Sequence, residues 1–343
     1  MQGEKQYKTG LDVGSTTAKI VIIDESGQTV FSRYERHNAQ VNDLLSAYFR
    51  EARQELGNIE TSIAVTGSVG MGTAEQLRTE FIQEVVAATR YAQQLYPSAS
   101  ALIDIGGEDA KVVLFQGNHI DLRMNGNCAG GTGAFIDQMA VLLGVDIEEL
   151  SRLALQAEHI HPIAARCGVF SKTDIQNLVS RNVPLGDIAA SIFHAVAVQT
   201  IVTLSRGWTF HPPILLCGGP LTFIPALRKA FADYLHLQES DFILPASGNL
   251  LPALGCALCA TEEKAVSLST LENLISRSTN ITTKNSLPPL FDSETDYDNW
   301  KKEKAHYNWP SAPLVQGIQE AVLGIDSGST TTKIVVTTPD GAI

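Results

Sequence analysis

The residues with the clearest chemical potential form a polar turn near the start of the chain. The turn combines one carboxylate, one glycine, three hydroxyls and one amine, supplied by Asp12, Gly14, Ser15, Thr16, Thr17 and Lys19. Glycine lets backbone N–H groups approach phosphate oxygens closely, and hydroxyl groups add hydrogen bonds. A carboxylate beside them can hold Mg²⁺ or its waters, which offsets phosphate charge. The turn predicts a phosphate-binding loop, although a single turn of this type also occurs in ordinary hairpins.

Two more turns add to this chemistry. The second turn begins 92 residues after Asp12 and contains Asp104, Gly106, Gly107, Glu108, Asp109 and Lys111. A third turn, Gly218-Gly219-Pro220, follows an apolar run and precedes a helical pattern. There the backbone could pass close to an adenosine. Neither a P-loop lysine motif nor a GxGxxG motif is present, so the three turns together must carry the prediction of ATP binding.

Two cysteines stand at predicted helix starts. Cys128 lies in NGNCAGGTGAF and Cys167 lies in ARCGVFSKTD. A helix N-terminus stabilises a thiolate and favours metal ligation, and the glycine neighbours leave room for a bulky inorganic cluster. A cubane iron–sulfur cluster needs four thiolates, which two copies of the chain would supply. The spacing alone also allows two helix-start cysteines without a metal.

The other three cysteines indicate core packing. Cys217 lies between an apolar strand and Gly218, so it is expected to be a small buried hydrophobe. Cys256 and Cys259 have CxxC spacing, but they lie in an apolar helix without a second pair. A structural role in the core is the simpler interpretation for all three.

The elements around the turns predict two related α/β halves. Residues 9–23 are expected to form a strand, a turn and a strand, and VFSRYER continues as a third strand. Residues 101–115 repeat the strand, turn and strand pattern. From Gly133 onward the periodicity becomes helical, with Asp146 as an expected N-cap. A strand over 214–216 then leads into the Gly-Gly turn.

Composition limits the classes of function. The chain has 343 residues, is 44% hydrophobic and 18% charged, and carries a formal net charge of -12. This acidic balance argues against non-specific binding to nucleic acid or to an anionic membrane. We expect no membrane span and no signal sequence, and hence a cytoplasmic protein whose cysteines are kept reduced.

An internal repeat appears near the end of the chain. DSGSTTTKIV at 326–335 matches DVGSTTAKIV at 12–21 in eight of ten positions. Residues 263–320 are rich in Ser, Thr, Asn, Asp and Pro and are expected to form a linker or extension. Residues 321–343 are therefore expected to begin a second, truncated ATPase domain.

The three turns, in this order and spacing, resemble those of the acetate kinase, sugar kinase, Hsp70 and actin superfamily. The resemblance covers about residues 9–262 and implies an α/β, actin-like ATPase fold of the ribonuclease H-like type. It implies duplicated half-domains, 1–100 and 101–262, around a nucleotide cleft. The first turn would contact the phosphates, the second the far side of the cleft, and Gly218 and Gly219 the adenosine. Asp12 and Asp104 would flank Mg²⁺, and Asp104 or Glu108 would orient the attacking water or alcohol.

The two cysteine motifs are similar to those of the ATPase activators of 2-hydroxyacyl-CoA dehydratases and the related benzoyl-CoA reductase ATPase subunits. This resemblance implies a homodimer in which Cys128 and Cys167 of both subunits hold one [4Fe–4S] cluster. It also implies that ATP drives electron transfer at low potential to a dehydratase or reductase partner. The partial second copy resembles the large activases that carry tandem domains.

Two alternatives remain open at the level of sequence. A small-molecule kinase, for example of a sugar or amino sugar, would use the same fold and phosphate loops but leaves the two cysteines unexplained. A regulatory or chaperone-like clamp without a cluster would need a separate substrate domain, and no such domain is apparent in the sequence.

Overall fold

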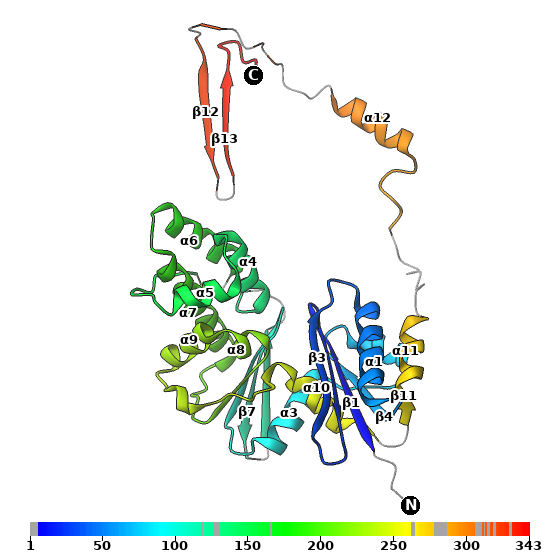
Figure 1. Ribbon diagram of the computed structural model, residues 1–343. Coiled ribbons are helices and arrows are strands. Elements are labelled where there is room, and N and C mark those ends of the chain that lie inside the picture. Colours follow the sequence, from blue (N-terminus) through cyan, green and yellow to red (C-terminus); the bar gives the residue numbers. More distant parts are fainter. Residues whose placement is uncertain are drawn as a thin grey trace, which may run out of the picture. The chain divides into compact units, whose positions relative to one another are not determined.

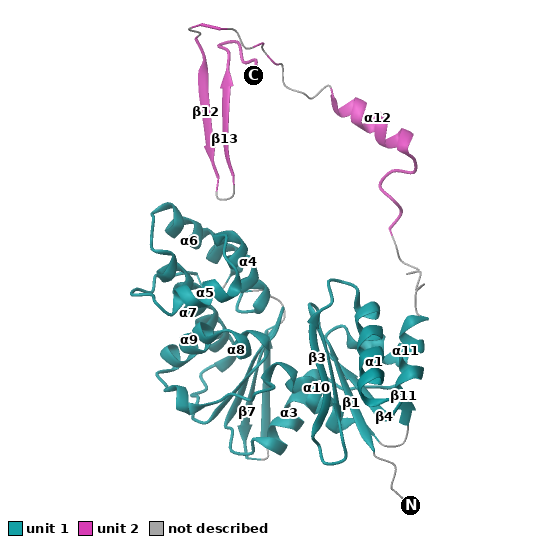
Figure 2. Ribbon diagram, in the orientation of Figure 1, with its two compact units in different colours: residues 1–279 teal, residues 280–343 magenta. Residues whose placement is uncertain are grey.

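The computed structural model of the chain divides into two compact units, residues 1–279 and 280–343 (Figures 1 and 2). It describes residues 6–117, 119–125, 130–164, 167–261, 265–277, 287–305, 311, 313, 316–317, 320–328 and 331–343.

The first sheet of unit 1 has the strand order β11-β4-β1-β2-β3, with β5 beside β4. Its strands are β1 (Tyr7–Val13), β2 (Thr17–Ile23), β3 (Thr29–Arg36), β4 (Glu60–Thr66), β5 (Glu80–Phe81) and β11 (Ala265–Ser267). Helices α1 (Val41–Leu56), α2 (Gly70–Leu77) and α11 (Leu268–Ser276) pack their apolar side chains against it. Because β1 is covered on both faces, its residues 9–13 are all buried, including the polar Thr9 and Asp12, and do not alternate between buried and exposed.

The second sheet repeats this topology with the order β10-β9-β6-β7-β8. Its strands are β6 (Ala101–Ile105), β7 (Ala110–Gln116), β8 (His119–Asn125), β9 (Ile214–Cys217) and β10 (Phe242–Ile243). β1 runs antiparallel to β2 and parallel to β4, and β6 runs antiparallel to β7 and parallel to β9. Asp12 faces Lys19 across its ladder, just as Asp104 faces Lys111. The predicted actin-like duplication is thus confirmed down to the residue register.

A helical layer covers the second sheet. It contains α4 (Gly133–Leu143), α5 (Ile147–Ala154), α6 (Gly168–Ser180), α7 (Leu185–Ser205), α8 (Gly219–Phe223) and α9 (Pro225–Leu235), and short 3₁₀ turns occupy Glu239–Asp241 and Gly248–Leu250. As predicted, the Asp146 side chain caps α5 by accepting from the N–H of Glu149. Helix α7 is long and apolar enough to cross a membrane, but 72% of its most apolar window is buried inside the protein. It therefore has the character of a core helix.

Two helices, α3 (Glu84–Leu95) and α10 (Leu251–Cys259), lie between the sheets (Figure 1). Their side chains share small cores with strands of both sheets. The backbones approach so closely that a Cβ at Gly255 would lie 1.8 Å from the carbonyl oxygen of Ala87. Likewise, a Cβ at Gly10 of β1 would lie 1.9 Å from the carbonyl oxygen of Ala253. Only glycine permits these two contacts, which join the half-domains.

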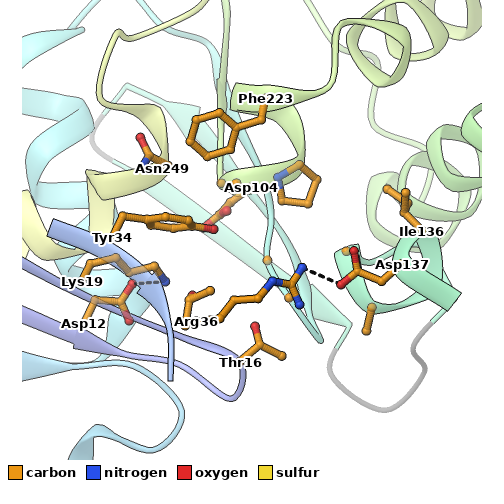
Figure 3. Close-up of a pocket in the computed structure, with 18 of the residues that line it drawn as sticks. Asp12, Thr16, Lys19, Tyr34, Arg36, Asp104, Ile136, Asp137, Phe223 and Asn249 are labelled. Carbon is orange, nitrogen blue, oxygen red and sulfur yellow. Dashed lines mark hydrogen bonds and ion pairs between the residues drawn. The ribbon is translucent and has the colours of Figure 1, made fainter. Parts of the chain in front are cut away.

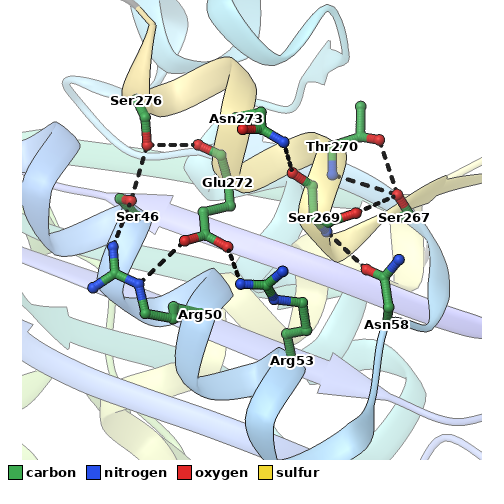
Figure 4. A network of polar contacts seen from close by, with 10 residues as sticks. All are labelled: Ser46, Arg50, Arg53, Asn58, Ser267, Ser269, Thr270, Glu272, Asn273 and Ser276. Atoms are coloured by element: carbon green, nitrogen blue, oxygen red, sulfur yellow. Dashed lines mark hydrogen bonds and ion pairs between the residues drawn. The ribbon is translucent and has the colours of Figure 1, made fainter.

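The start of the expected linker belongs to unit 1. Residues 265–267 pair with β4 as strand β11, and α11 buries Leu268, Leu271 and Ile275 completely. Figure 4 shows how polar groups fasten α11 to α1, with Glu272 bound to both Arg50 and Arg53. The helical spacing of the three apolar residues indicates a packed helix, but the polar composition of the whole segment favoured a linker.

Unit 2 contains helix α12 (Glu294–Ala305) and the hairpin β12 (Val322–Ser327) and β13 (Thr332–Thr337). In the hairpin, Val322 pairs with Thr337 and Asp326 pairs with Lys333. Lys8 pairs with Ile23 and Asp12 with Lys19 at the equivalent places of β1 and β2. The sequence repeat therefore extends to the same register of strand pairing.

We predict that Gly255→Ala destabilises unit 1 by about 2–4 kcal/mol, because the added methyl group must displace the backbone of Ala87. Denaturant unfolding followed by circular dichroism measures this change. Gly72→Ala is the matched control, since a Cβ there meets nothing within 4 Å. Equal effects of the two substitutions would contradict the proposed close packing of α3 and α10.

Candidate active site between the half-domains

A cavity of about 270 Å³ lies where the two halves of unit 1 face each other (Figure 3). Its lining includes nine of the residues singled out from the sequence, which are Asp12, Thr16, Thr17, Lys19, Asp104, Gly106, Gly107, Gly218 and Gly219. The three turns, separated by about a hundred residues each in the chain, thus meet at one place. Gly14, Ser15 and Glu108 are not part of this lining, and the Glu108 side chain is exposed.

The two charged residues of the first turn, Asp12 and Lys19, form a largely buried ion pair. The N–H of Gly14 donates to the carbonyl oxygen of Thr17 at 2.9 Å, which closes the turn. Lys19 Nζ lies 2.8 Å from Asp12 Oδ2. Burial lowers the pKa of Lys19, but the charge and hydrogen bond of Asp12 outweigh this and raise it overall. Lys19 therefore stays protonated beside the cavity.

The other carboxylate oxygen, Asp12 Oδ1, is buried and has no hydrogen-bond partner among the described residues. A buried carboxylate oxygen without a partner is costly unless something else satisfies it. A Mg²⁺ ion or one of its waters would do so, because this ion prefers oxygen ligands and usually keeps several waters. The residues present therefore fit the metal ion that the sequence predicted at this place.

The second turn has the same backbone geometry. The N–H of Gly106 donates to the carbonyl oxygen of Asp109 at 2.8 Å. Lys111 Nζ contacts Glu84 Oε1 at 2.8 Å and Asp109 Oδ2 at 2.9 Å. Burial raises the pKa of Asp104, and the nearby Lys111 opposes this effect. The second turn thus holds a cluster of opposite charges next to Glu84 and Asp104, which line the cavity.

Glycines let the backbone press against both buried aspartates. A Cβ at Gly218, where φ is +86°, would lie 2.4 Å from Asp104 Oδ1. A Cβ at Gly67, where φ is +98°, would lie 2.5 Å from Asp12 Oδ1. The two glycines follow the equivalent strands β9 and β4, so the duplication includes them. Gly218 was predicted from the sequence, but Gly67 was not. The TGS turn at the end of a short apolar strand could have indicated that Gly67 belongs to the site.

The two phosphate turns face each other at short range. A Cβ at Gly107 would lie 2.3 Å from Oγ1 of Thr16. A side chain at position 107 would therefore push the halves apart, whereas glycine lets the two turns approach each other. This close approach allows N–H groups and hydroxyls from both halves to act on a single phosphate chain.

Several residues that line the cavity were not predicted from the sequence. Tyr34 and Arg36 project from β3, and Glu84 is the first residue of α3. The Tyr34 and Phe223 ring centroids are 5.8 Å apart, and Arg36 Nη2 lies 2.7 Å from Asp137 Oδ2. Tyr34 and Arg36 could have been predicted together, because side chains alternate along a strand and positions 34 and 36 of β3 therefore lie on one face.

Of the two candidate cluster ligands, Cys128 lies outside the described residues. Cys167 is partly exposed and precedes the first turn of α6 in an extended conformation. The next residue, Gly168, lies close to Gly130. A Cβ added at Gly168 would be 3.6 Å from the backbone nitrogen of Gly130. Gly130 stands two positions after Cys128 in the sequence. Gly130 and Gly168, which follow the two cysteines by two positions and one position, are therefore adjacent in space.

The remaining cysteines agree with the predicted packing role. Cys217 and Cys256 are fully buried, and burial raises the pKa of both thiols. Cys259 is partly buried. Within the described ranges, no group of three or more His, Cys, Asp or Glu side chains is arranged to hold a metal ion.

The duplicated sheets and the cavity between them define an ATPase of the actin-like fold. A family model described as the BadF/BadG/BcrA/BcrD ATPase family matches residues 9–260. The chain belongs to this family, as its resemblance to the dehydratase activators indicated, and it is an ATP hydrolase. Membership does not favour the small-molecule kinase alternative.

Individual relatives agree with this assignment. The chain is 28% identical over 276 residues to the 2-hydroxyisocaproyl-CoA dehydratase activator of Clostridioides difficile, covering 78% of this chain and 100% of that protein. It is 29% identical over 265 residues to the (R)-2-hydroxyglutaryl-CoA dehydratase activating ATPase of Acidaminococcus fermentans, covering 76% and 98%. The solved activator of the 2-hydroxyisocaproyl-CoA dehydratase from Clostridium difficile with bound ADPNP superposes with a TM-score of 0.63 at 26% identity, covering 81% and 100%.

Glu84 gives the site a predicted pH dependence. Burial raises the pKa of Glu84 to about 7, Lys111 opposes this effect, and Asp12 and Asp104 add to it. An unfolded glutamate has a pKa near ~4.3, so between about pH 4.5 and 7 the folded state binds more protons than the unfolded state. The Glu84 contribution to the free energy of unfolding therefore falls as pH rises through this window.

Glu84→Gln should remove this contribution, so wild type should lose more stability than the variant between pH 5 and 7.5. Urea unfolding at several pH values without nucleotide measures the difference. Glu80→Gln is the control, because Glu80 is exposed. A constant difference between wild type and Glu84→Gln across this range would show that the pKa of Glu84 is not raised.

Proposed function

We propose that the protein is an ATP-dependent reductive activator. It transfers a low-potential electron to a partner of the 2-hydroxyacyl-CoA dehydratase type or to an acyl-CoA reductase, and ATP hydrolysis drives this transfer. The relatives are named as activators of such dehydratases. The proposed electron acceptors are therefore partner proteins that react with acyl-CoA substrates.

The observation that carries the proposal is a direct backbone connection between the nucleotide site and the cysteine region. The N–H of Gly133 donates to the carbonyl oxygen of Gly106 at 3.0 Å, and the N–H of Ala134 donates to that of Gly107 at 2.7 Å. Helix α4, which follows the Cys128 segment, is thus attached to the second phosphate turn. A change in that turn on ATP binding would move the start of α4 directly.

In the ATPase reaction, the two turns bind the triphosphate from opposite sides. Asp12 and Asp104 would hold Mg²⁺, which offsets phosphate charge during transfer. Asp104, the buried carboxylate of the second turn, orients the attacking water, and Lys19 keeps Asp12 in place through its 2.8 Å contact. Glu108 is the second candidate for this role, although its exposed side chain would first have to turn toward the cavity. Gly218 and Gly219 leave room for the adenosine.

Cys128 and Cys167 of two subunits would hold one [4Fe–4S] cluster across a homodimer interface, and this cluster supplies the electron. The chemistry of the donors fits, because thiolates are the usual ligands of such a cluster. Cys167 is accessible at the start of α6, and the exposed Val169 and Phe170 beside it suit an interface with another subunit.

The division of the chain and its location are also proposals. We propose half-domains over 1–100 and 101–262, an extension over 263–320 and the start of a second ATPase domain over 321–343. The shared register of β12–β13 and β1–β2 supports the last of these. The first part of the extension, β11 and α11, packs within unit 1, and its remainder would be the connecting region. A cytoplasmic location suits cysteines that must stay reduced.

The cluster is tested by measuring iron and acid-labile sulfide after anaerobic purification. We expect about two irons and two sulfides per chain in the wild type, since two chains share four of each. Cys128→Ser and Cys167→Ser should each lose both, whereas the control Cys259→Ser should retain them. A folded wild type that hydrolyses ATP without iron would contradict the electron-donor function.

A further inference from the structure

Arg36 reaches across the cleft from the first half-domain to helix α4, which follows the Cys128 segment. It lies on β3, and its guanidinium donates to Asp137 Oδ2 on α4 at 2.7 Å (Figure 3). Both residues also line the nucleotide cavity. The pair is therefore placed where a phosphate group could compete with Asp137 for the guanidinium.

The charges of the cavity favour such a competition. Four carboxylates line its described wall, from Asp12, Glu84, Asp104 and Asp137, but only two cationic side chains do so, from Lys19 and Arg36. Lys19 is only 14% exposed and is already held by the buried Asp12. Arg36 is 61% exposed, so it is the lining cation that can turn toward a ligand at the least cost.

The partner that Arg36 now holds is a weak one. Asp137 is 35% exposed, and ion pairs in contact with water stabilise a protein little. A terminal phosphate offers two or three oxygens with a higher charge, and the planar guanidinium can bind two of them at once. A triphosphate in the cavity would therefore be the stronger partner.

We propose that Arg36 is a positioning residue that distinguishes ATP from ADP and reports the difference to α4. With a terminal γ-phosphate in the cleft, Arg36 leaves Asp137 and binds the phosphate, which releases α4 from β3. With ADP, the γ-phosphate is absent and Arg36 stays on Asp137. This inference rests on the proposed function, since α4 follows the cysteine segment that the nucleotide is proposed to control.

The first test is nucleotide discrimination, measured by calorimetry with ADP and the non-hydrolysable triphosphate ADPNP. Arg36→Gln should weaken ADPNP binding by about tenfold or more, because a charge-assisted contact is lost, and should leave ADP binding within about twofold. Arg36→Lys, which keeps the charge but not the planar fork, should fall between wild type and Arg36→Gln.

Arg33→Gln is the matched control. Arg33 lies on the same strand but binds Glu51 and Glu55 of α1 and does not line the cavity. This variant should keep the discrimination of the wild type.

The second test follows α4 by hydrogen–deuterium exchange of a peptide over 133–143. In the wild type, ADPNP should increase exchange relative to ADP, and this difference should vanish in Arg36→Gln. Asp137→Asn should show the increased exchange even without nucleotide. Both measurements are independent of the iron–sulfur cluster.

The outcomes separate this inference from the proposed function. If Arg36→Gln weakens ADP and ADPNP equally or weakens neither, the proposal for Arg36 is wrong while the ATPase activator remains. If exchange over α4 ignores the nucleotide in the wild type, the proposal for Arg36 is wrong and the proposed coupling of the nucleotide to α4 is contradicted as well. If the wild type binds neither nucleotide, the proposed function falls together with this inference.

Discussion

The whole arrangement depends on the close crossing of α3 and α10 between the two sheets. Each sheet is stable only if both of its faces are covered, and these two helices cover the inner face of both. The glycines at positions 10 and 255 allow backbone to touch backbone there. Such a narrow contact holds the halves together at one place and leaves the strand ends free to face each other across a cavity. Both helices also begin at that cavity, where Glu84 and Pro252 line the wall, so their positive N-termini favour an anionic ligand.

The electrostatics of the cavity have the signature of a functional site. Burying Lys19, Lys111 and their carboxylate partners costs solvation energy that the ion pairs only partly offset. A protein selected for stability alone would do as well with apolar side chains there. The unpartnered Asp12 oxygen adds to this cost and becomes favourable only with a cation present. The surplus of carboxylates thus supports the proposal that the site binds a magnesium-bound triphosphate.

Much of the fold and half of the site could be predicted from the sequence, because the residues that define them are close together along the chain. Each phosphate turn combines its glycine, aspartate and lysine within a few positions, and the hairpin around it sets their geometry. Glu84 and Asp137 could not be found this way, since only tertiary packing brings them to the cavity. Strand β8 was missed because its apolar residues Ile120, Leu122 and Met124 are exposed and alternate with polar ones, so the segment lacks the buried apolar run of β6 and β7. The roles of Cys128 and Cys167 as cluster ligands remain predictions from the sequence motifs.

We propose that nucleotide in the cleft controls a metal centre held by Cys128 and Cys167. Electron paramagnetic resonance of the dithionite-reduced protein tests it most directly, with no nucleotide, with ADP and with ADPNP. We expect an iron–sulfur signal whose line shape changes with ADPNP but not with ADP, and a signal in Asp12→Asn that changes with neither nucleotide. A reduced protein without such a signal, or with one that is the same in all three states of the wild type, would contradict it.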